Sequence, residues 1–344
     1  MKAAVLSEVG KIGIEEREIP KIKKNELLVK IRHVGICGSD LHYYEHGRIG
    51  DFVVEKPIVL GHESAGEVAA VGEEVTGFQV GDLVTLEPGY TCGKCEFCKT
   101  GRYNLCPDVV FMATPPFDGA FAEFVAYPAD MAFKLPKGMS TMEGALVEPL
   151  AVGIHAAKQA GASLGQSAMI LGAGCIGLVT MMALKAMGVT TIYMADVVQK
   201  RLDKAMELGA TGVVAADRED TAARIMELTG NRGMDLVIEC AGNINTILQT
   251  TELVKRGGKI VLVGMAPESK MVFDIGRLMA KEASISTVFR YRNIYPSAIG
   301  AIERGLIPIG KIVTDIFGFD EISHAMEYSV SNKKDIVKAV IEFK

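Results

Sequence analysis

The sequence predicts an α/β protein with two parts, and three observations carry this prediction. Short β-type runs separated by glycine or proline fill residues 1–150. Apolar strands alternate with helices over 151–289, which is typical of a doubly wound parallel sheet covered on both faces. The 344 residues, of which 49% are hydrophobic, suffice for two cores. Residues 290–344 again carry short strands and helices, and we expect them to complete the first part.

The β-type runs of the first part alternate in polarity or are β-branched. In chain order they are "KAAVL", "ELLVKIRHVGICG", "SAGEVAAVG" and "DLVTLEPG". Glycine or proline interrupts them, so we expect a barrel-like region with few helices.

The second part begins at 167–188, where a strand, a glycine turn and a helix follow one another. Further strands are expected at "TIYMAD", "GVVAA", "MDLVIECAG", "KIVLVGM" and "SISTVF". The helices between them are expected at "QKRLDKAMELG", "DTAARIMELTG", "INTILQTTELVKRGG" and "IGRLMAKEA". Strands and helices in strict alternation indicate βαβ units.

Composition argues against several functions. The net charge is −5 and no run of lysine or arginine occurs, which argues against nucleic-acid and membrane partners. The first residues, "MKAAVLSEVG", contain no apolar signal core, so we expect a cytoplasmic protein. Seven cysteines in such a protein favour metal ligation over a disulfide framework.

A glycine turn predicts a dinucleotide site. Gly172, Gly174 and Gly177 form a G-x-G-x-x-G pattern between a strand and a helix. Asp196 ends the next strand, where an acid binds the ribose hydroxyls of the cofactor. This favours NAD over NADP, although Arg201 could either stack on the adenine or pair with a phosphate. A glycine turn without a ligand is the simpler alternative, and the acid in the βαβ context argues against it.

Two sets of metal-ligating residues are present. The spacing C-x₂-C-x₂-C-x₇-C gives a closed, structural zinc site rather than free thiols, and its members are Cys92, Cys95, Cys98 and Cys106. The second set is dispersed and combines thiolate, imidazole and carboxylate groups, as open catalytic zinc sites do: Cys37, His62, Glu63 and Glu148. Each of these four also has an ordinary structural explanation, and spacing alone does not join them.

Several long strings resemble the zinc-dependent medium-chain alcohol dehydrogenases over essentially the whole chain. These strings are "CGSDLHYYEHGRIGDF", "GHESAGEV", "GRYNLC", "FMATPPFDGAFAEF", "EGALVEPLAVGIHA", "GAGCIG" and "VFRYRN". Within that superfamily they resemble the sorbitol (L-iditol 2-) dehydrogenases. The resemblance implies a GroES-like catalytic domain, 1–150 completed by 290–344, and a Rossmann NAD-binding domain at 151–289.

The resemblance also implies roles for individual residues. Cys37, His62 and Glu63 match catalytic zinc ligands, and Glu148 matches an acid that contacts the zinc directly or through water. Ser39 and His42 are candidates for a proton relay, with Glu63 or Glu148 as the alternative base. Positions that line the polyol site are matched by Tyr43, Phe111, Glu148, Arg290 and Tyr291. Cofactor contacts beyond the glycines are matched by Ile176, Asp196, Arg201, Val263, Gly264, Met265, Val288, Phe289 and Arg290.

The function implied is oxidation of a secondary alcohol of sorbitol, xylitol or a related polyol to the ketose. NAD and two zinc ions per subunit, one catalytic and one structural, are the implied cofactors, in a homotetramer. Dehydrogenases of 2,3-butanediol, threonine or galactitol 1-phosphate are the alternatives within the superfamily. A zinc-ribbon-like binding module is the alternative outside the enzymes, and the acidic charge argues against it. A nucleotide-binding protein without catalysis is a further alternative, and the complete dispersed ligand set argues against it.

Overall fold

The computed structural model describes residues 1–266, 268 and 270–344. The chain divides into two compact units: Met1–Glu148 with Tyr295–Lys344, and Pro149–Ile294. The sequence placed the corresponding boundaries at 150 and 290. Among the described residues, no helix combines the length and the apolar character that a membrane span requires.

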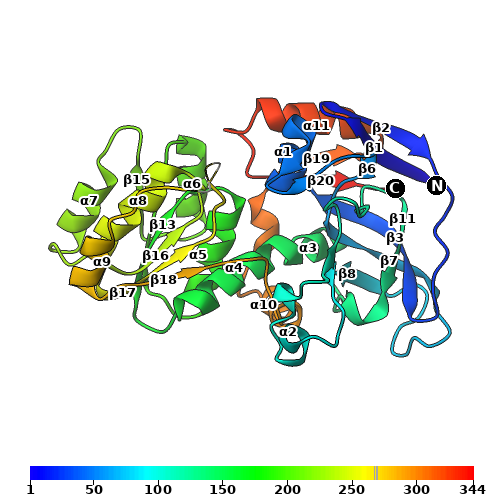
Figure 1. Ribbon diagram of the computed structural model, residues 1–344, viewed down its shortest axis with the longest axis horizontal. Helices are drawn as coiled ribbons and strands as arrows, with labels where there is room; N and C mark the ends of the chain where they lie inside the picture. Colours follow the sequence, from blue (N-terminus) through cyan, green and yellow to red (C-terminus); the bar gives the residue numbers. More distant parts are fainter. Residues whose placement is uncertain (267, 269) are drawn as a thin grey trace. The chain divides into compact units, whose positions relative to one another are not determined.

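The first unit is built mainly of strands (Figure 1). Its largest sheet has the order β12-β8-β7-β3-β20-β19, with β11 also paired to β3, and a smaller sheet has the order β2-β1-β6. Two short antiparallel pairs, β4–β5 and β9–β10, complete the strands. The bounds are β1 (Lys2–Glu8), β2 (Lys11–Glu16), β3 (Glu26–Gly35), β4 (Arg48–Ile49), β5 (Phe52–Val53), β6 (Ile58–Val59), β7 (Glu63–Val71), β8 (Leu83–Leu86), β9 (Gly89–Tyr90), β10 (Val110–Phe111), β11 (Phe124–Pro128), β12 (Ala132–Lys134), β19 (Val313–Gly318) and β20 (Lys338–Glu342).

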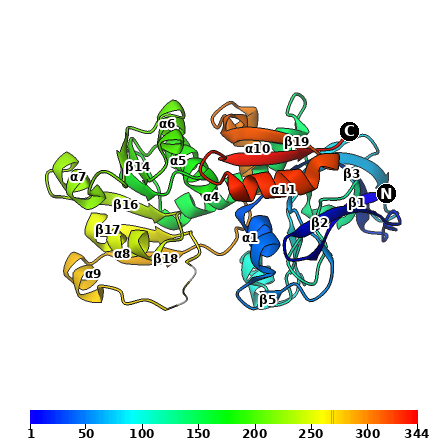
Figure 2. The same cartoon turned by 90° about the horizontal axis from the view of Figure 1, so that it is seen from above.

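The helices of this unit are short. The α-helices are α1 (Gly38–His46), α2 (Glu96–Lys99), α3 (Thr141–Ala145), α10 (Tyr295–Glu303) and α11 (Ile322–Ser331). The 3₁₀ turns are η1 (Tyr103–Leu105), η2 (Ala129–Met131), η3 (Ile309–Ile312) and η4 (Phe319–Glu321). Figure 2 shows α11 lying along β19, and it also contacts α1, β2 and β20. Residues after 295 therefore complete the first unit, because β20 pairs with β3 in antiparallel fashion.

The second unit contains a six-stranded sheet whose strands are all parallel, with the order β15-β14-β13-β16-β17-β18. Its strands are β13 (Ser167–Leu171), β14 (Thr191–Asp196), β15 (Gly212–Ala215), β16 (Met234–Glu239), β17 (Val254–Leu262) and β18 (Ser284–Thr287). Its helices are α4 (Val147–Ala160), which begins just before the boundary, α5 (Cys175–Ala186), α6 (Gln199–Glu207), α7 (Thr221–Leu228), α8 (Ile244–Leu253) and α9 (Ile275–Lys281). The strand order reverses between β13 and β16, and ligands bind at such a point in doubly wound sheets.

One expected helix was too long. The sequence predicted a helix over 244–258, but α8 ends at Leu253 and β17 begins at Val254. Val254 pairs with Met234 of β16, and Gly257 has a φ of 66°, which a helix cannot contain. Helix α1, which the sequence did not predict, begins at Gly38 after the Cys37 cap. The shorter α8 reflects strand pairing, which local patterns do not reveal. Helix α1 instead begins with a local contact, in which the amide of Cys37 donates to the carboxylate of Asp40.

Candidate metal centres and dinucleotide pocket

Four cysteines converge in the segment 92–106, which we call the cysteine lobe. Their potential ligand atoms all lie within 4.8 Å of one another. The sulfur–sulfur distances are 3.4 Å for Cys95–Cys98, 3.6 Å for Cys92–Cys106 and 4.0 Å for Cys92–Cys98. Zinc–sulfur bonds of about 2.3 Å in a tetrahedron place the sulfur atoms about 3.8 Å apart. The lobe therefore fits a closed zinc site.

Backbone amides of the lobe donate hydrogen bonds to the sulfur atoms that would bind a metal ion. The amide of Cys95 donates to the sulfur of Cys92 at 3.4 Å, and that of Cys98 donates to Cys95 at 3.5 Å. A hydrogen bond from Thr91 lowers the pKa of Cys98 to about 7, whereas burial raises the pKa of Cys106 to about 12. A metal ion would therefore displace a proton most readily from the first of these two thiols.

A second group, which we call the mixed cluster, consists of Cys37, His62 and Glu63. One potential ligand atom from each residue lies within 4.8 Å of the others. Antiparallel pairing of β3 with β7 sets Gly35 opposite Glu63, and Cys37 follows shortly after Gly35. Thiolate, imidazole and carboxylate donors suit an open zinc site. The register of two strands thus joins residues that the sequence left apart.

Asp40, which the sequence analysis did not single out, supports the mixed cluster. Its carboxylate is fully buried and accepts hydrogen bonds from the amides of Cys37 at 2.9 Å and Gly61 at 3.0 Å. It also lies 3.8 Å from Nδ1 of His62. Burial raises the pKa of Asp40, and the charge of His62 opposes this shift. At this distance, which is longer than a hydrogen bond, Asp40 acts on the imidazole of His62 through its charge. Sequence reasoning missed Asp40 because its role depends on its burial and on α1, a helix that the sequence did not predict.

Lys338 is a second residue that sequence reasoning missed. Its ammonium group is buried and lies 2.7 and 2.8 Å from the two carboxylate oxygens of Glu63. It also donates to the carbonyl of Ile36 at 3.0 Å. This ion pair compensates the buried negative charge of Glu63, because a buried carboxylate without a partner would destabilise the folded protein. The signal was a lysine inside the apolar run "IVKAVIEF".

Glu148 lies buried in the first turn of α4. It is not part of the compact 4.8 Å set, but its charge acts on His62. Burial lowers the pKa of His62, yet Cys37, Asp40 and Glu148 together raise it well above its ordinary value. The surroundings of this imidazole are therefore strongly negative, as a cation site requires.

Apart from Glu63 and Glu148, the predicted substrate and relay residues of the first unit lie on β10 and α1. The ring of Phe111 is 5.6 Å from the ring of His62, which places it beside the mixed cluster. Tyr43 is buried on α1, where Ser39 is half-buried and His42 is exposed. Burial and the neighbouring His46 lower the pKa of His42.

Arg290 and Tyr291 belong to the second unit. Tyr291 is buried, whereas the guanidinium of Arg290 lies 4.9 Å above the ring of Phe289. Arg290 has a φ of 54°, a strained value for a residue with a side chain. The surrounding structure therefore holds the backbone of Arg290 in a conformation that it would otherwise rarely adopt.

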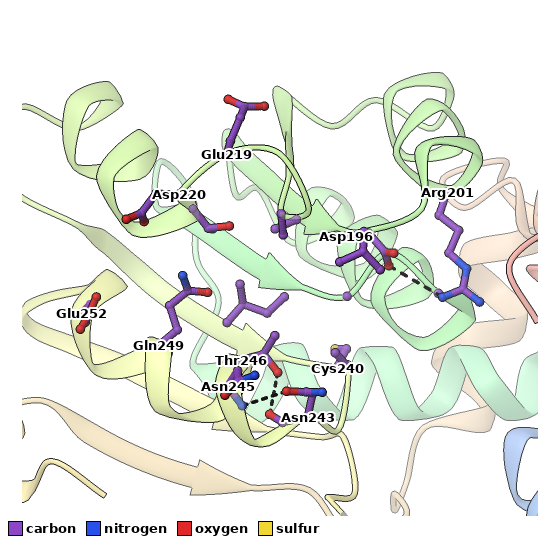
Figure 3. Close-up of a pocket in the computed structure, with 18 residues that line it drawn as sticks. Asp196, Arg201, Glu219, Asp220, Cys240, Asn243, Asn245, Thr246, Gln249 and Glu252 are labelled. Carbon is purple, nitrogen blue, oxygen red and sulfur yellow. Dashed lines mark hydrogen bonds and ion pairs between the residues drawn. The ribbon is translucent and has the colours of Figure 1, made fainter.

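A cavity of about 740 Å³ opens at the carboxyl ends of β13, β14 and β16 (Figure 3). The glycine turn forms part of its wall through Gly172 and Gly174. Gly172 has a φ of 99°, and a side chain at Gly177 would come within 1.9 Å of the carbonyl of Gly172. These two positions therefore require glycine for the turn and for the close approach of α5 to the turn.

Asp196 connects the glycine turn to the loop after β14. Its carboxylate accepts hydrogen bonds from the amides of Ala173 at 2.7 Å and Val198 at 2.9 Å. Arg201 faces it at 3.8 Å (Figure 3). Each carboxylate oxygen has a second lone pair, so Asp196 can still accept hydrogen bonds from hydroxyl groups of a ligand.

The cavity contains only part of the predicted cofactor set. Gly172, Gly174, Asp196 and Arg201 line it. The predicted residues outside its lining are Ile176, Gly177, Val263, Gly264, Met265, Val288, Phe289 and Arg290. Lining residues that the sequence analysis missed include Val197, Glu219, Asp220, Ala241, Asn243, Asn245 and Thr246. They follow β14, β15 and β16, so the carboxyl ends of the strands were the available signal.

The buried carboxylate of Glu239 stabilises the loop after β16 through hydrogen bonds. One of its oxygens accepts hydrogen bonds from the amides of Ala241 and Gly242 at 2.9 Å and from the hydroxyl of Thr246 at 2.8 Å. Burial raises the pKa of Glu239. Because Ala241 and Thr246 line the cavity, Glu239 fixes part of its wall without touching it.

Comparison with known proteins gives two matching family models. The alcohol dehydrogenase GroES-like domain matches residues 23–137, and the zinc-binding dehydrogenase domain matches residues 175–304. These matches, with the parallel sheet, confirm the predicted fold class.

Full-length relatives extend these matches. A sorbitol dehydrogenase from Bacillus subtilis is 43% identical over 99% of this chain and 97% of its own. A crystal structure from Escherichia coli, described as an oxidoreductase/dehydrogenase of unknown specificity involved in membrane biogenesis, is 46% identical, with a TM-score of 0.96 over 100% of this chain and 99% of that one. The 2R,3R-butanediol dehydrogenase of Bacillus subtilis is 33% identical, with a TM-score of 0.91 over 99% of both chains. The resemblance seen in the sequence is thereby confirmed: this chain belongs to the zinc-dependent medium-chain alcohol dehydrogenase family.

Proposed function

We propose that the protein is a polyol dehydrogenase that oxidises a secondary alcohol of sorbitol, xylitol or a related polyol to the ketose with NAD. The observation that carries this proposal is the convergence of Cys37, His62 and Glu63, whose donors fit an open zinc site. The sorbitol dehydrogenase relative supports the substrate class.

Residues of the mixed cluster would hold the catalytic zinc, with Glu148 beside it. When bound, the ion would supply Lewis-acid polarisation of the alcohol oxygen. Asp40 adds a buried negative charge beside His62, and Lys338 balances the charge of Glu63. The cysteine lobe would hold the structural zinc.

The remaining residues bind substrate and cofactor and move the proton. Phe111, next to His62, and Tyr43 are proposed to contact the polyol, together with Glu148, Arg290 and Tyr291. Ser39 and the exposed His42 on α1 are proposed to pass the alcohol proton to water. Asp196 would accept hydrogen bonds from the adenosine ribose of NAD, and its negative charge disfavours the 2′-phosphate of NADP.

We also propose a cytoplasmic homotetramer in which residues 1–150 and 290–344 form the catalytic domain and residues 151–289 the cofactor domain. The division into two compact units at Glu148 and Tyr295 supports the domain proposal.

A substrate panel tests the proposal. NADH formation at 340 nm would be measured with sorbitol, xylitol, galactitol, 2,3-butanediol, threonine and galactitol 1-phosphate, each with NAD and NADP. The highest kcat/KM is expected for a polyol with NAD. The main rival substrate is 2,3-butanediol, because a structural neighbour is a 2R,3R-butanediol dehydrogenase. A higher kcat/KM for 2,3-butanediol than for any polyol would overturn the proposed substrate class. Preference for NADP would overturn the role of Asp196.

A further inference from the structure

Two histidines on α1 lie outside both candidate metal centres. His42 and His46 are separated by one helical turn on α1, which places them on one face of the helix. Both side chains are exposed, and their ring centroids are 4.7 Å apart with an interplanar angle of 69°. We propose that these two imidazoles form an additional surface site for a divalent transition-metal ion such as Zn²⁺, and that an ion there inhibits the enzyme.

The spacing of the rings suits one shared ion. With metal–nitrogen bonds of about 2.0–2.1 Å, each ring centre lies about 3.2 Å from the ion, so octahedral or tetrahedral angles put the centres about 4.5–5.2 Å apart. The observed 4.7 Å falls within this interval. The torsion that turns a histidine ring is soft, so exposed rings can direct a nitrogen to the ion without moving the helix. Two histidines at this helical spacing are an established way to bind zinc.

The charges around the pair do not oppose a cation. Burial and His46 lower the pKa of His42, which favours the neutral imidazole that binds metal. Glu45 lies on the same helix, and Lys333, in the turn after α11, approaches its carboxylate at 2.6 Å. Because this ion pair is balanced, the nearest charges leave the histidine site close to neutral.

The inhibitory effect rests on the proposed function, in which His42 passes a proton to water. An imidazole nitrogen bound to a metal ion cannot accept a proton. An ion shared by His42 and His46 would therefore interrupt the relay while Cys37, His62 and Glu63 remain loaded. The inhibition would appear only when zinc exceeds the amount that fills the mixed cluster and the cysteine lobe.

Calorimetric titration of ZnCl₂ into the zinc-loaded enzyme tests the site without using activity. The parent is expected to bind one additional ion, and His46→Gln is expected to weaken that binding by about tenfold or more because one of two chelating groups is lost. His324→Gln removes another exposed histidine, on α11, and should behave as the parent. Equal binding by His46→Gln and the parent, or no additional ion in the parent, would overturn the site.

Turnover in increasing ZnCl₂ tests the inhibition. Loss of activity in the parent and in His324→Gln, but not in His46→Gln, is expected, with equal turnover of all three at low zinc. Binding without loss of turnover would overturn the inhibitory role. If the parent oxidised no polyol, the proposed function would fail, and the calorimetry would still decide the site.

Discussion

The cysteine lobe and the mixed cluster are built in opposite ways. All four candidate ligands of the lobe come from one short segment, whose own amides donate to its sulfur atoms. The mixed cluster depends on the register of β3 and β7 and on Lys338, which comes from the last strand of the chain. A local site can close on its metal completely, whereas a site assembled from distant strands can leave a position for substrate. The difference predicts that changes to the two sites will affect different properties.

The largest effect is expected from His62→Ala in the mixed cluster. Loss of the imidazole removes a proposed metal ligand, and metal ions contribute several kcal/mol to transition-state stabilisation. We expect turnover to fall by more than about 1000-fold, with NADH affinity unchanged. Enzyme assays, zinc analysis and NADH fluorescence would measure these quantities. Turnover close to that of the parent would show that the mixed cluster is not the catalytic centre.

Lys338→Met tests whether the mixed cluster depends on the distant strand β20. The substitution leaves the carboxylate of Glu63 buried without its partner, which is expected to lower the free energy of unfolding by about 3–5 kcal/mol. Lys333→Met is the matched control, because it breaks the partly exposed pair with Glu45 and should cost less than about 1 kcal/mol. Thermal unfolding of both variants would compare them. Equal losses in the free energy of unfolding would mean that the buried Lys338–Glu63 pair stabilises the protein no more than the partly exposed Lys333–Glu45 pair.

The same contrast explains what the sequence could predict. The ligands of the lobe and the glycine turn follow from local spacing, because one segment contains every residue involved. Cys37 and His62 could be joined only through family resemblance, because their meeting depends on strand register. Asp40 and Lys338 were missed because burial, rather than residue type, creates their roles. Helix α8 was predicted too long because the pairing of Val254 with β16 overrides local helical pattern.

Cys106→Ser tests the lobe as a structural site. A hydroxyl replaces one thiolate of the closed set, so we expect the melting temperature to fall by about 5–10 °C, with kcat of the folded protein changed less than about threefold. Cys175→Ser, which changes a cysteine outside both clusters, should leave zinc content and melting temperature unchanged. Unchanged melting with a large loss of kcat would assign the chemistry to the lobe instead.

A hydrogen bond joins the lobe to the residue that follows β8. The hydroxyl of Tyr103 in the lobe donates to the carboxylate of Glu87 at 2.6 Å, and Glu87 is buried directly after β8. Burial raises the pKa of Glu87 from 4.5 to about 7, the hydrogen bond from Tyr103 opposes this, and the charge of Glu148 adds to it. Glu87 thus interacts with both Tyr103 of the lobe and Glu148 beside the mixed cluster.

A raised carboxyl pKa means that the folded protein holds a proton which the unfolded chain has lost between pH 4.5 and about 7. The free energy of unfolding therefore falls as pH rises through this range, by at most about 3 kcal/mol from this group. Glu87→Gln cannot titrate, so its stability should exceed that of the parent increasingly as pH rises from about 5 to 8. Glu96→Gln, on the exposed surface of the lobe, is the control and should follow the parent. Thermal unfolding at both pH values measures the difference, and parallel pH profiles for Glu87→Gln and the parent would mean that Glu87 does not titrate in this range.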